Sequence, residues 1–174
     1  MQGLIQLYTG DGKGKSTAAF GLAIRAAGRG FGVAVLQFLK NRITGELISI
    51  EKLGNIPVHR VNMSPKFTWD MNEEELAELY GESKRGLEHA KALAASGEYS
   101  VIILDEFIHT IVKGYVSKED VLEFFATRPG NVELVLTGRN APDWLIEAAD
   151  LCTEMRCIKH PFEKGIPARR GIEN

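Results

Sequence analysis

The sequence predicts an α/β fold in which a mostly parallel sheet carries helices on both faces. Two near-continuous apolar runs, 33–38 and 101–104, are typical of parallel strands that are buried on both sides. Between them, residues 73–95 repeat apolar side chains at helical spacings, which indicates a long amphipathic helix. Strands that alternate with helices are joined by right-handed crossovers into a parallel sheet. We therefore expect a three-layer fold, with a single domain over residues 1–174.

The first strand and the first helix flank a glycine-rich loop. An apolar run at 4–8 precedes this loop, and helix-favouring residues at 16–29 follow it. Repeated glycines leave room for backbone N–H groups to turn inward around phosphates, and the positive end of the helix dipole points to the same place. Lys15 is placed to reach phosphate oxygens, and the Ser16 hydroxyl can ligate a Mg²⁺ that bridges them. The residues predicted to bind the nucleotide here are Thr9, Gly10, Asp11, Gly12, Lys13, Gly14, Lys15, Ser16 and Thr17.

This loop departs from the pattern G-x-x-x-x-G-K-[ST] at its first position. The G-K-S ending fits, but Thr9 stands where the first glycine is expected. A carboxylate that faced phosphates would be repelled, so we expect Asp11 to face solvent or the ribose hydroxyls, while Lys13 adds positive charge. A glycine turn that binds nothing is the alternative. The coincidence of strand, loop and helix onset argues against it.

The remaining elements continue the alternation. Further strands are expected at 33–38, 58–61, 101–106, 132–136 and 151–155. A short segment at 47–53 and the long helix at 73–95 lie among them, and a helix at 142–149 precedes the last strand. Ser117 and Asp120 form a capping pair that indicates one more helix. The tail from Lys159 shows little periodicity and is expected to be irregular.

Two acids end one of the buried strands. The carboxyl edge of an α/β sheet is where ligands bind, so Asp105 and Glu106 can add oxygen ligands to a Mg²⁺ that Ser16 and the phosphates hold. A structural role, in which one acid caps the next turn, is the alternative. Arg139 follows a strand at the same edge, where it would clamp phosphate or another polar substrate group, or remain a plain surface arginine. Arg25, one helix length from the loop, carries the same two interpretations.

Composition excludes several classes of protein. The 21 Lys and Arg against 23 Asp and Glu leave no basic excess of the kind expected of a nucleic-acid-binding domain. No run approaches 18 apolar residues and no leader precedes the first strand, so we expect a cytoplasmic protein without a membrane segment. Cys152 and Cys157 stand apart from any second pair, which favours reduced thiols over zinc. None of the four histidines lies in a nucleophile or metal pattern, so no general base is assigned.

Two large aromatic residues stand in a loop beside a proline. Phe67 and Trp69 are either core anchors or an apolar wall for a large flat ligand. Together with other short stretches, they form a pattern that closely resembles the ATP:corrinoid adenosyltransferases of the cob(I)alamin P-loop family. The resemblance covers almost the whole chain, and the loop and the Phe-x-Trp-Asp motif are its most distinctive parts. The matching stretches are 9–21, 37–40, 45–46, 67–70, 104–106, 137–139, 159–162 and 171–173.

The resemblance implies a P-loop NTPase-like fold and a transfer of the 5′-deoxyadenosyl group from ATP to the Co(I) of a reduced corrinoid, with release of triphosphate. Co(I) is itself a strong nucleophile, so the protein need not supply a base. It also implies that Lys13, Lys15 and Ser16, with Mg²⁺ or Mn²⁺, neutralise charge on the leaving triphosphate. Glu106 is the favoured metal ligand by the same resemblance.

The resemblance further implies that the nucleotide lies in reverse of the usual P-loop sense. Asp11 would then lie near the ribose and Arg25 near the nucleoside. Phe67 and Trp69 would face the corrin and help to remove its lower axial ligand, which makes them catalytic residues together with Lys15. A homodimer and a flavin-type electron donor are the expected partners.

The sequence also departs from its relatives. Asp11 stands where several of them carry Asn, and Ser16 where many carry Thr. Some relatives have an N-terminal helix over the corrinoid site, whereas this sequence starts at the strand, so a dimer partner or the tail is expected to close the site. Two other functions stay open from the residues alone. A P-loop kinase or ATPase fits the loop and the acids, although Phe-x-Trp-Asp disfavours it, and a non-catalytic corrinoid or nucleotide carrier would need only the loop.

Overall fold

The structure is a computed structural model that describes residues 2–40, 43–61, 66 and 70–173. Its centre is a six-stranded sheet in the order β3-β2-β4-β5-β1-β6, and every neighbouring pair of strands is parallel. This confirms the predicted α/β class. The strands are β1 Ile5–Thr9, β2 Val33–Gln37, β3 Val58–Arg60, β4 Val101–Asp105, β5 Glu133–Thr137 and β6 Leu151–Glu154. The helices are α1 Lys15–Ala27, α2 Gly45–Leu53, α3 Glu73–Ala95, α4 Phe107–Val112, α5 Lys118–Thr127, α6 Asp143–Ala148 and the 3₁₀ helix η2 Pro161–Lys164.

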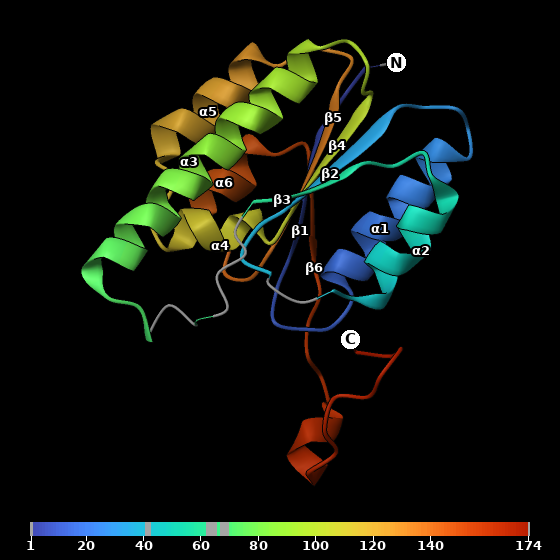
Figure 1. Cartoon of the computed structure of the whole chain (residues 1–174), viewed down its shortest axis with the longest axis vertical. Coiled ribbons are helices and arrows are strands. Elements are labelled where there is room, and N and C mark those ends of the chain that lie inside the picture. Colours follow the sequence, from blue (N-terminus) through green and yellow to red (C-terminus); the bar gives the residue numbers. More distant parts are fainter. Residues whose placement is uncertain (1, 41–42, 62–65, 67–69, 174) are drawn as a thin grey trace.

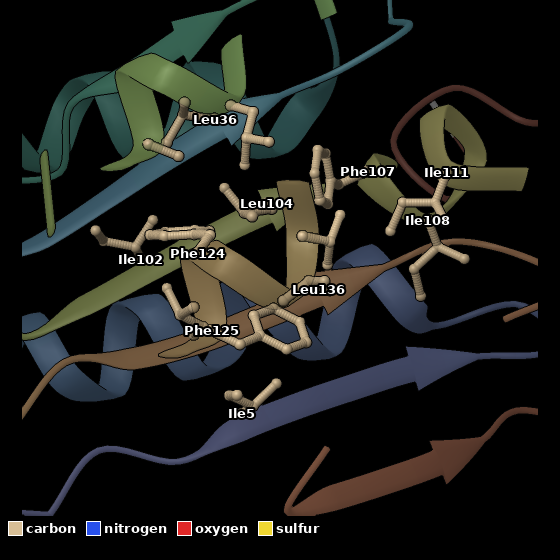
Figure 2. Packing of buried hydrophobic residues seen from close by; sticks show 14 of the residues in the cluster. Ile5, Leu36, Ile102, Leu104, Phe107, Ile108, Ile111, Phe124, Phe125 and Leu136 are labelled. Atoms are coloured by element: carbon tan, nitrogen blue, oxygen red, sulfur yellow. The ribbon is translucent and has the colours of Figure 1, made fainter. Parts of the chain in front are cut away.

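Helices cover both faces of the sheet, so the three expected layers are present. Figure 1 shows α1 and α2 on one face and α3, α4, α5 and α6 on the other. The core is divided accordingly. A smaller apolar cluster lies under α1, around Ala19, Phe20 and Ile103. A larger one lies under the opposite helices, where Phe107, Phe124 and neighbouring aliphatic side chains pack together (Figure 2).

Burial explains the sequence pattern of the strands. All residues of β2, β4 and β5 are buried, as expected for parallel strands that have a helix layer on each side. β1 alternates between buried and half-buried residues, and all four residues of the edge strand β6 are exposed. In the sheet register, Gln37 at the end of β2 lies opposite Asp105 at the end of β4. The chain therefore leaves these strands at one common carboxyl edge.

Most element boundaries agree with the sequence prediction to within two residues, and the differences have local causes. The long helix spans Glu73–Ala95 as expected, because Asn72 and Glu75 form a capping box at its start. The prediction was wrong in omitting α4, a six-residue helix that starts directly after Glu106. It also left the short helix η2 out of the otherwise irregular tail. Among the described residues, no helix is long and apolar enough to cross a membrane.

Candidate functional site

The glycine-rich loop joins β1 to α1 at the carboxyl edge of the sheet. Gly14 is the N-cap of α1 and has φ 121°, a conformation that side chains disfavour. Gly12 lies close to the chain after β6. Its N–H donates to the carbonyl oxygen of Met155 at 2.7 Å, and a Cβ at this position would lie only 2.6 Å from the same oxygen. Glycine at 12 and 14 is therefore required by the shape of the loop.

Lys15 opens α1 and is the buried cation of the loop. Only 8% of the residue is exposed, and its Nζ donates to the carbonyl oxygen of Gly12 at 2.7 Å. Burial, followed by the positive charge of Arg139, lowers the pKa of the Lys15 ammonium, while Glu106 acts in the opposite direction. An anion that entered the loop would favour the charged form of this lysine.

Asp105 is fully buried at the end of β4, and its carboxylate accepts hydrogen bonds from several side chains. The hydroxyl of Thr137 donates to its Oδ1 at 2.8 Å, and Gln37 Nε2 donates to its Oδ2 at 3.1 Å. Burial alone would raise the pKa of this carboxyl, but the Lys40 ammonium and the hydrogen bonds hold it below its usual value. Asp105 is therefore a fixed carboxylate.

Glu106 has left-handed backbone dihedrals, with φ 61°, although it is not a glycine. Such a conformation is strained and persists only where the surroundings enforce it. Its N–H donates to the Thr137 hydroxyl at 2.9 Å, and its Oε2 lies 2.7 Å from Nδ1 of His109. The turn carries the partly exposed carboxylate of Glu106 into the space in front of the loop.

Lys40 links the loop to both acids. Its Nζ lies 2.8 Å from Oδ2 of Asp105 and 3.1 Å from Oγ of Ser16. It also lies 3.9 Å from Oε1 of Glu106. The three residues that the sequence nominated as metal ligands therefore come together around one positive charge. Hydroxyl and carboxylate oxygens are hard ligands of the kind Mg²⁺ prefers, so this donor set fits the metal.

The C-terminal tail reaches back to the same loop. Nζ of Lys13 donates to the carbonyl oxygen of Ile172 at 2.8 Å and pairs with Oε1 of Glu173 at 3.1 Å. Arg169 hydrogen-bonds the Glu173 carboxylate and, with Lys13, lowers its pKa to about 2. The tail thus lies against the exposed lysine of the loop.

These residues surround one cleft of about 530 Å³. Its lining includes the loop from Asp11 to Thr17, Lys40, Glu106, Arg139 and parts of the tail. Arg139 therefore lines the cleft, which its interpretation as a clamp for phosphate or another polar substrate group requires. Arg25 is exposed on α1 and is absent from the described lining, as are the buried Thr9 and the neighbouring Gly10. Phe67 and Trp69 lie outside the described residues.

Sequence reasoning assigned no role to four residues that the structure brings to the site. The residues that contact Asp105 or Glu106 directly are Gln37, Lys40, His109 and Thr137. Their positions carried one usable signal, since Lys40 and Thr137 end or follow strands at the carboxyl edge. His109 carried none, because it lies on the helix that the sequence analysis missed.

Comparison with known proteins relates this chain to one family. The model of the family described as ATP:corrinoid adenosyltransferase BtuR/CobO/CobP matches residues 1–174. A corrinoid adenosyltransferase from Sinorhizobium sp. is 40% identical over 174 residues, which cover 99% of this chain and 80% of the relative. The corrinoid adenosyltransferase of Escherichia coli (strain K12) is 35% identical over 173 residues, which cover 99% of this chain and 86% of the relative.

A likeness in structure supports the fold alone. The flagellar accessory protein FlaH from Methanocaldococcus jannaschii superimposes with a TM-score of 0.57 at 17% sequence identity. The match covers 88% of this chain and 71% of that one.

Proposed function

Because the chain belongs to the ATP:corrinoid adenosyltransferase family, we propose that it transfers the 5′-deoxyadenosyl group of ATP to the Co(I) of a reduced corrinoid. The observation that carries this proposal for the site is the convergence of Lys15, Lys40, Ser16 and Glu106 on one cleft. Such a cleft combines positive charge for a triphosphate with oxygen donors for a divalent cation.

The reaction balances without a protein base. A lone pair on Co(I) attacks C5′ of ATP and forms a cobalt–carbon bond, while the C5′–O bond breaks and its electron pair leaves with the triphosphate. Cobalt is thereby formally oxidised by two electrons to Co(III), and no proton moves. The residues of this chain are needed to position the two substrates and to stabilise the leaving group.

The leaving group gains negative charge on the oxygen that was bonded to C5′. Lys15 and Arg139 are proposed to stabilise that charge, since both line the cleft and Lys15 is buried from water. Lys13 is proposed to add to the same field once its partners in the tail give way. A fixed positive charge in a site that excludes water stabilises such an anion more than it would in solvent.

Ser16 and Glu106 are proposed to hold Mg²⁺, with Asp105 behind them. Asp105 has no exposed surface and orients Lys40 and Thr137, whereas Glu106 faces the cleft, so Glu106 is the better candidate for a direct ligand. In the described ranges, no three His, Cys, Asp or Glu side chains gather as a metal site, and phosphate oxygens are proposed to add to the ligands that Ser16 and Glu106 supply. When bound, Mg²⁺ supplies positive charge that the leaving triphosphate needs.

The other predicted contacts stay proposals that rest on the family. Asp11 is proposed to contact the ribose and Arg25 the nucleoside, with the nucleotide reversed in the loop. Phe67 and Trp69 are proposed to face the corrin ring and to displace its lower axial ligand. A homodimer and a flavin-type electron donor are proposed on the same ground.

An anaerobic assay with chemically reduced cobalamin, ATP and Mg²⁺ tests the proposal. Wild-type protein should form a light-sensitive cobalt–carbon product that is followed by its visible absorbance. Glu106→Gln should lower the rate by about 100-fold or more, because the metal contributes several kcal/mol to the stability of the transition state. Glu98→Gln, the same change at an exposed residue outside the cleft, is the matched control and should leave the rate unchanged. Equal rates for the two variants would contradict the assignment of Glu106.

A further inference from the structure

The Lys40 ammonium occupies the space between the oxygens proposed to hold the metal. Its Nζ lies 2.8 Å from Oδ2 of Asp105, 3.1 Å from Oγ of Ser16 and 3.9 Å from Oε1 of Glu106. An ammonium is a compact charge with three donors, so it can satisfy several oxygens at once. In this arrangement a side chain of the protein takes the place expected of a cation from solution.

The backbone of Lys40 is fixed, whereas its side chain has room to move. Nη2 of Arg60 donates to the carbonyl oxygen of Lys40 at 2.8 Å, and the N–H of Phe38 donates to the carbonyl oxygen of Asp105 at 2.9 Å. Leu39, between them, has a left-handed φ of 52°. The side chain of Lys40 is 26% exposed, and its four-carbon stem is flexible. The ammonium can therefore leave its partners without a change in the sheet.

Two hollows meet at Lys40. One is the cleft in front of the glycine-rich loop. The other, of about 260 Å³, is lined by Leu39, Lys40, Glu106, His109, Lys113 and Tyr115. A displaced ammonium thus has space on both sides of Glu106. One of these spaces is where the triphosphate oxygens are proposed to lie.

We propose that Lys40 is an internal cation that holds the metal ligands together before nucleotide binds and gives them up when Mg²⁺ arrives with ATP. This inference rests on the proposed function, because it takes Ser16 and Glu106 to hold the metal, with the carboxylate of Asp105 behind them. Two cations that share the same carboxylates repel each other, so Lys40 must withdraw before a divalent ion can bind there. ATP brings negative oxygens that can receive the ammonium, whereas a metal ion alone does not. The nucleotide-free protein should therefore bind divalent ions weakly.

Titration of nucleotide-free protein with Mn²⁺, followed by electron paramagnetic resonance of the free ion, tests this competition. Lys40→Met should bind Mn²⁺ at least about tenfold more tightly than wild type, which corresponds to about 1.4 kcal/mol. Lys113→Met is the matched control, since Lys113 lines the second hollow but, within the described residues, makes no hydrogen bond or ion pair with Ser16, Asp105 or Glu106. It should bind Mn²⁺ as wild type does. Lys40→Arg keeps the positive charge and should bind Mn²⁺ weakly.

A second readout covers the case in which the loss of charge weakens the fold. Asp105 is fully buried and loses its ion pair in Lys40→Met, so this variant should melt at a lower temperature than wild type. Mn²⁺ should raise the melting temperature of Lys40→Met by more than that of wild type. Lys40→Gln keeps hydrogen-bond donors but carries no charge, so Mn²⁺ should also raise its melting temperature by more than that of wild type. This variant replaces Lys40→Met in the test if Lys40→Met does not fold.

The result that would overturn the inference is equal Mn²⁺ affinity in wild type, Lys40→Met and Lys40→Gln. Such a result would leave Lys40 as a structural partner of Asp105 only. Neither ATP nor a corrinoid is present in these measurements, so they are independent of adenosyl transfer. If wild type transfers the adenosyl group but wild type and the Lys40 variants bind Mn²⁺ equally, this inference alone is refuted. If wild type shows no adenosyl transfer but the Mn²⁺ affinities follow the expected order, the proposed function alone is refuted.

Discussion

Replacing Lys15 by alanine is the perturbation whose magnitude follows most directly from the structure. The residue is 8% exposed at the start of α1, and its Nζ bonds only the carbonyl oxygen of Gly12 among the described hydrogen bonds. A phosphate oxygen would replace that neutral acceptor with a charged one. Hydrogen bonds to charged groups contribute about 1.5–3 kcal/mol each. The loss of one such bond corresponds to about 10- to 150-fold weaker binding of ATP.

Titration calorimetry of Mg-ATP against wild type, Lys15→Ala and Lys13→Ala measures this difference. The Lys13 side chain is 52% exposed and already paired with Glu173, so its removal should cost at most about 1 kcal/mol, or about fivefold in affinity. Melting curves should show that both variants fold, because neither lysine contributes to the apolar core. Unchanged affinity in Lys15→Ala, or a larger loss in Lys13→Ala, would refute the assignment of Lys15 as the buried phosphate ligand.

Three further predictions concern the corrin side, the acid pair and the pH dependence of stability. Phe67→Ala and Trp69→Ala should leave ATP affinity unchanged but abolish the spectroscopic signature of four-coordinate Co(II), and retention of that signature in both variants would contradict a corrin-facing role. Thr137→Val removes the hydroxyl that donates to Asp105 at 2.8 Å, and should lower the free energy of unfolding in urea by about 1–3 kcal/mol. Burial lowers the pKa of His59, so the unfolded state binds its proton first and wild type should lose stability as the pH falls below about 6.5. His59→Asn should flatten that part of the profile, and an unchanged slope would show that other groups cause it.

The fold could be predicted because its strongest signals are local. The apolar runs of β2 and β4 and the periodic helix α3 each mark a single element within a few residues of sequence. The helix α4 could not be found in this way, since six residues are too few to display a period. It directly follows a left-handed Glu106, a conformation that tertiary contacts with Thr137 and His109 support and that the residue type does not indicate.

The site could be predicted only as far as its motifs are continuous in sequence. The glycine-rich loop and the Asp105-Glu106 pair are recognisable from their neighbours, and the structure brings the loop and Glu106 to one cleft, with the buried Asp105 bonded to Lys40 of its lining. The contact between Lys40 and Asp105 spans 65 residues and depends on β2 lying beside β4 in register. Strand order is a property of the whole sheet, so no local pattern could show that Lys40 lies between Ser16, Asp105 and Glu106.

Phosphorus NMR of a completed anaerobic reaction tests the central claim most directly, because each candidate function assigns a different fate to the phosphates of ATP. With reduced corrinoid present, attack at C5′ should release intact triphosphate, and no triphosphate should form when the corrinoid is omitted. A non-catalytic carrier would leave ATP unchanged under both conditions. ADP and orthophosphate as the main products, in equal amounts with and without corrinoid, would contradict adenosyl transfer and identify the protein as an ATPase.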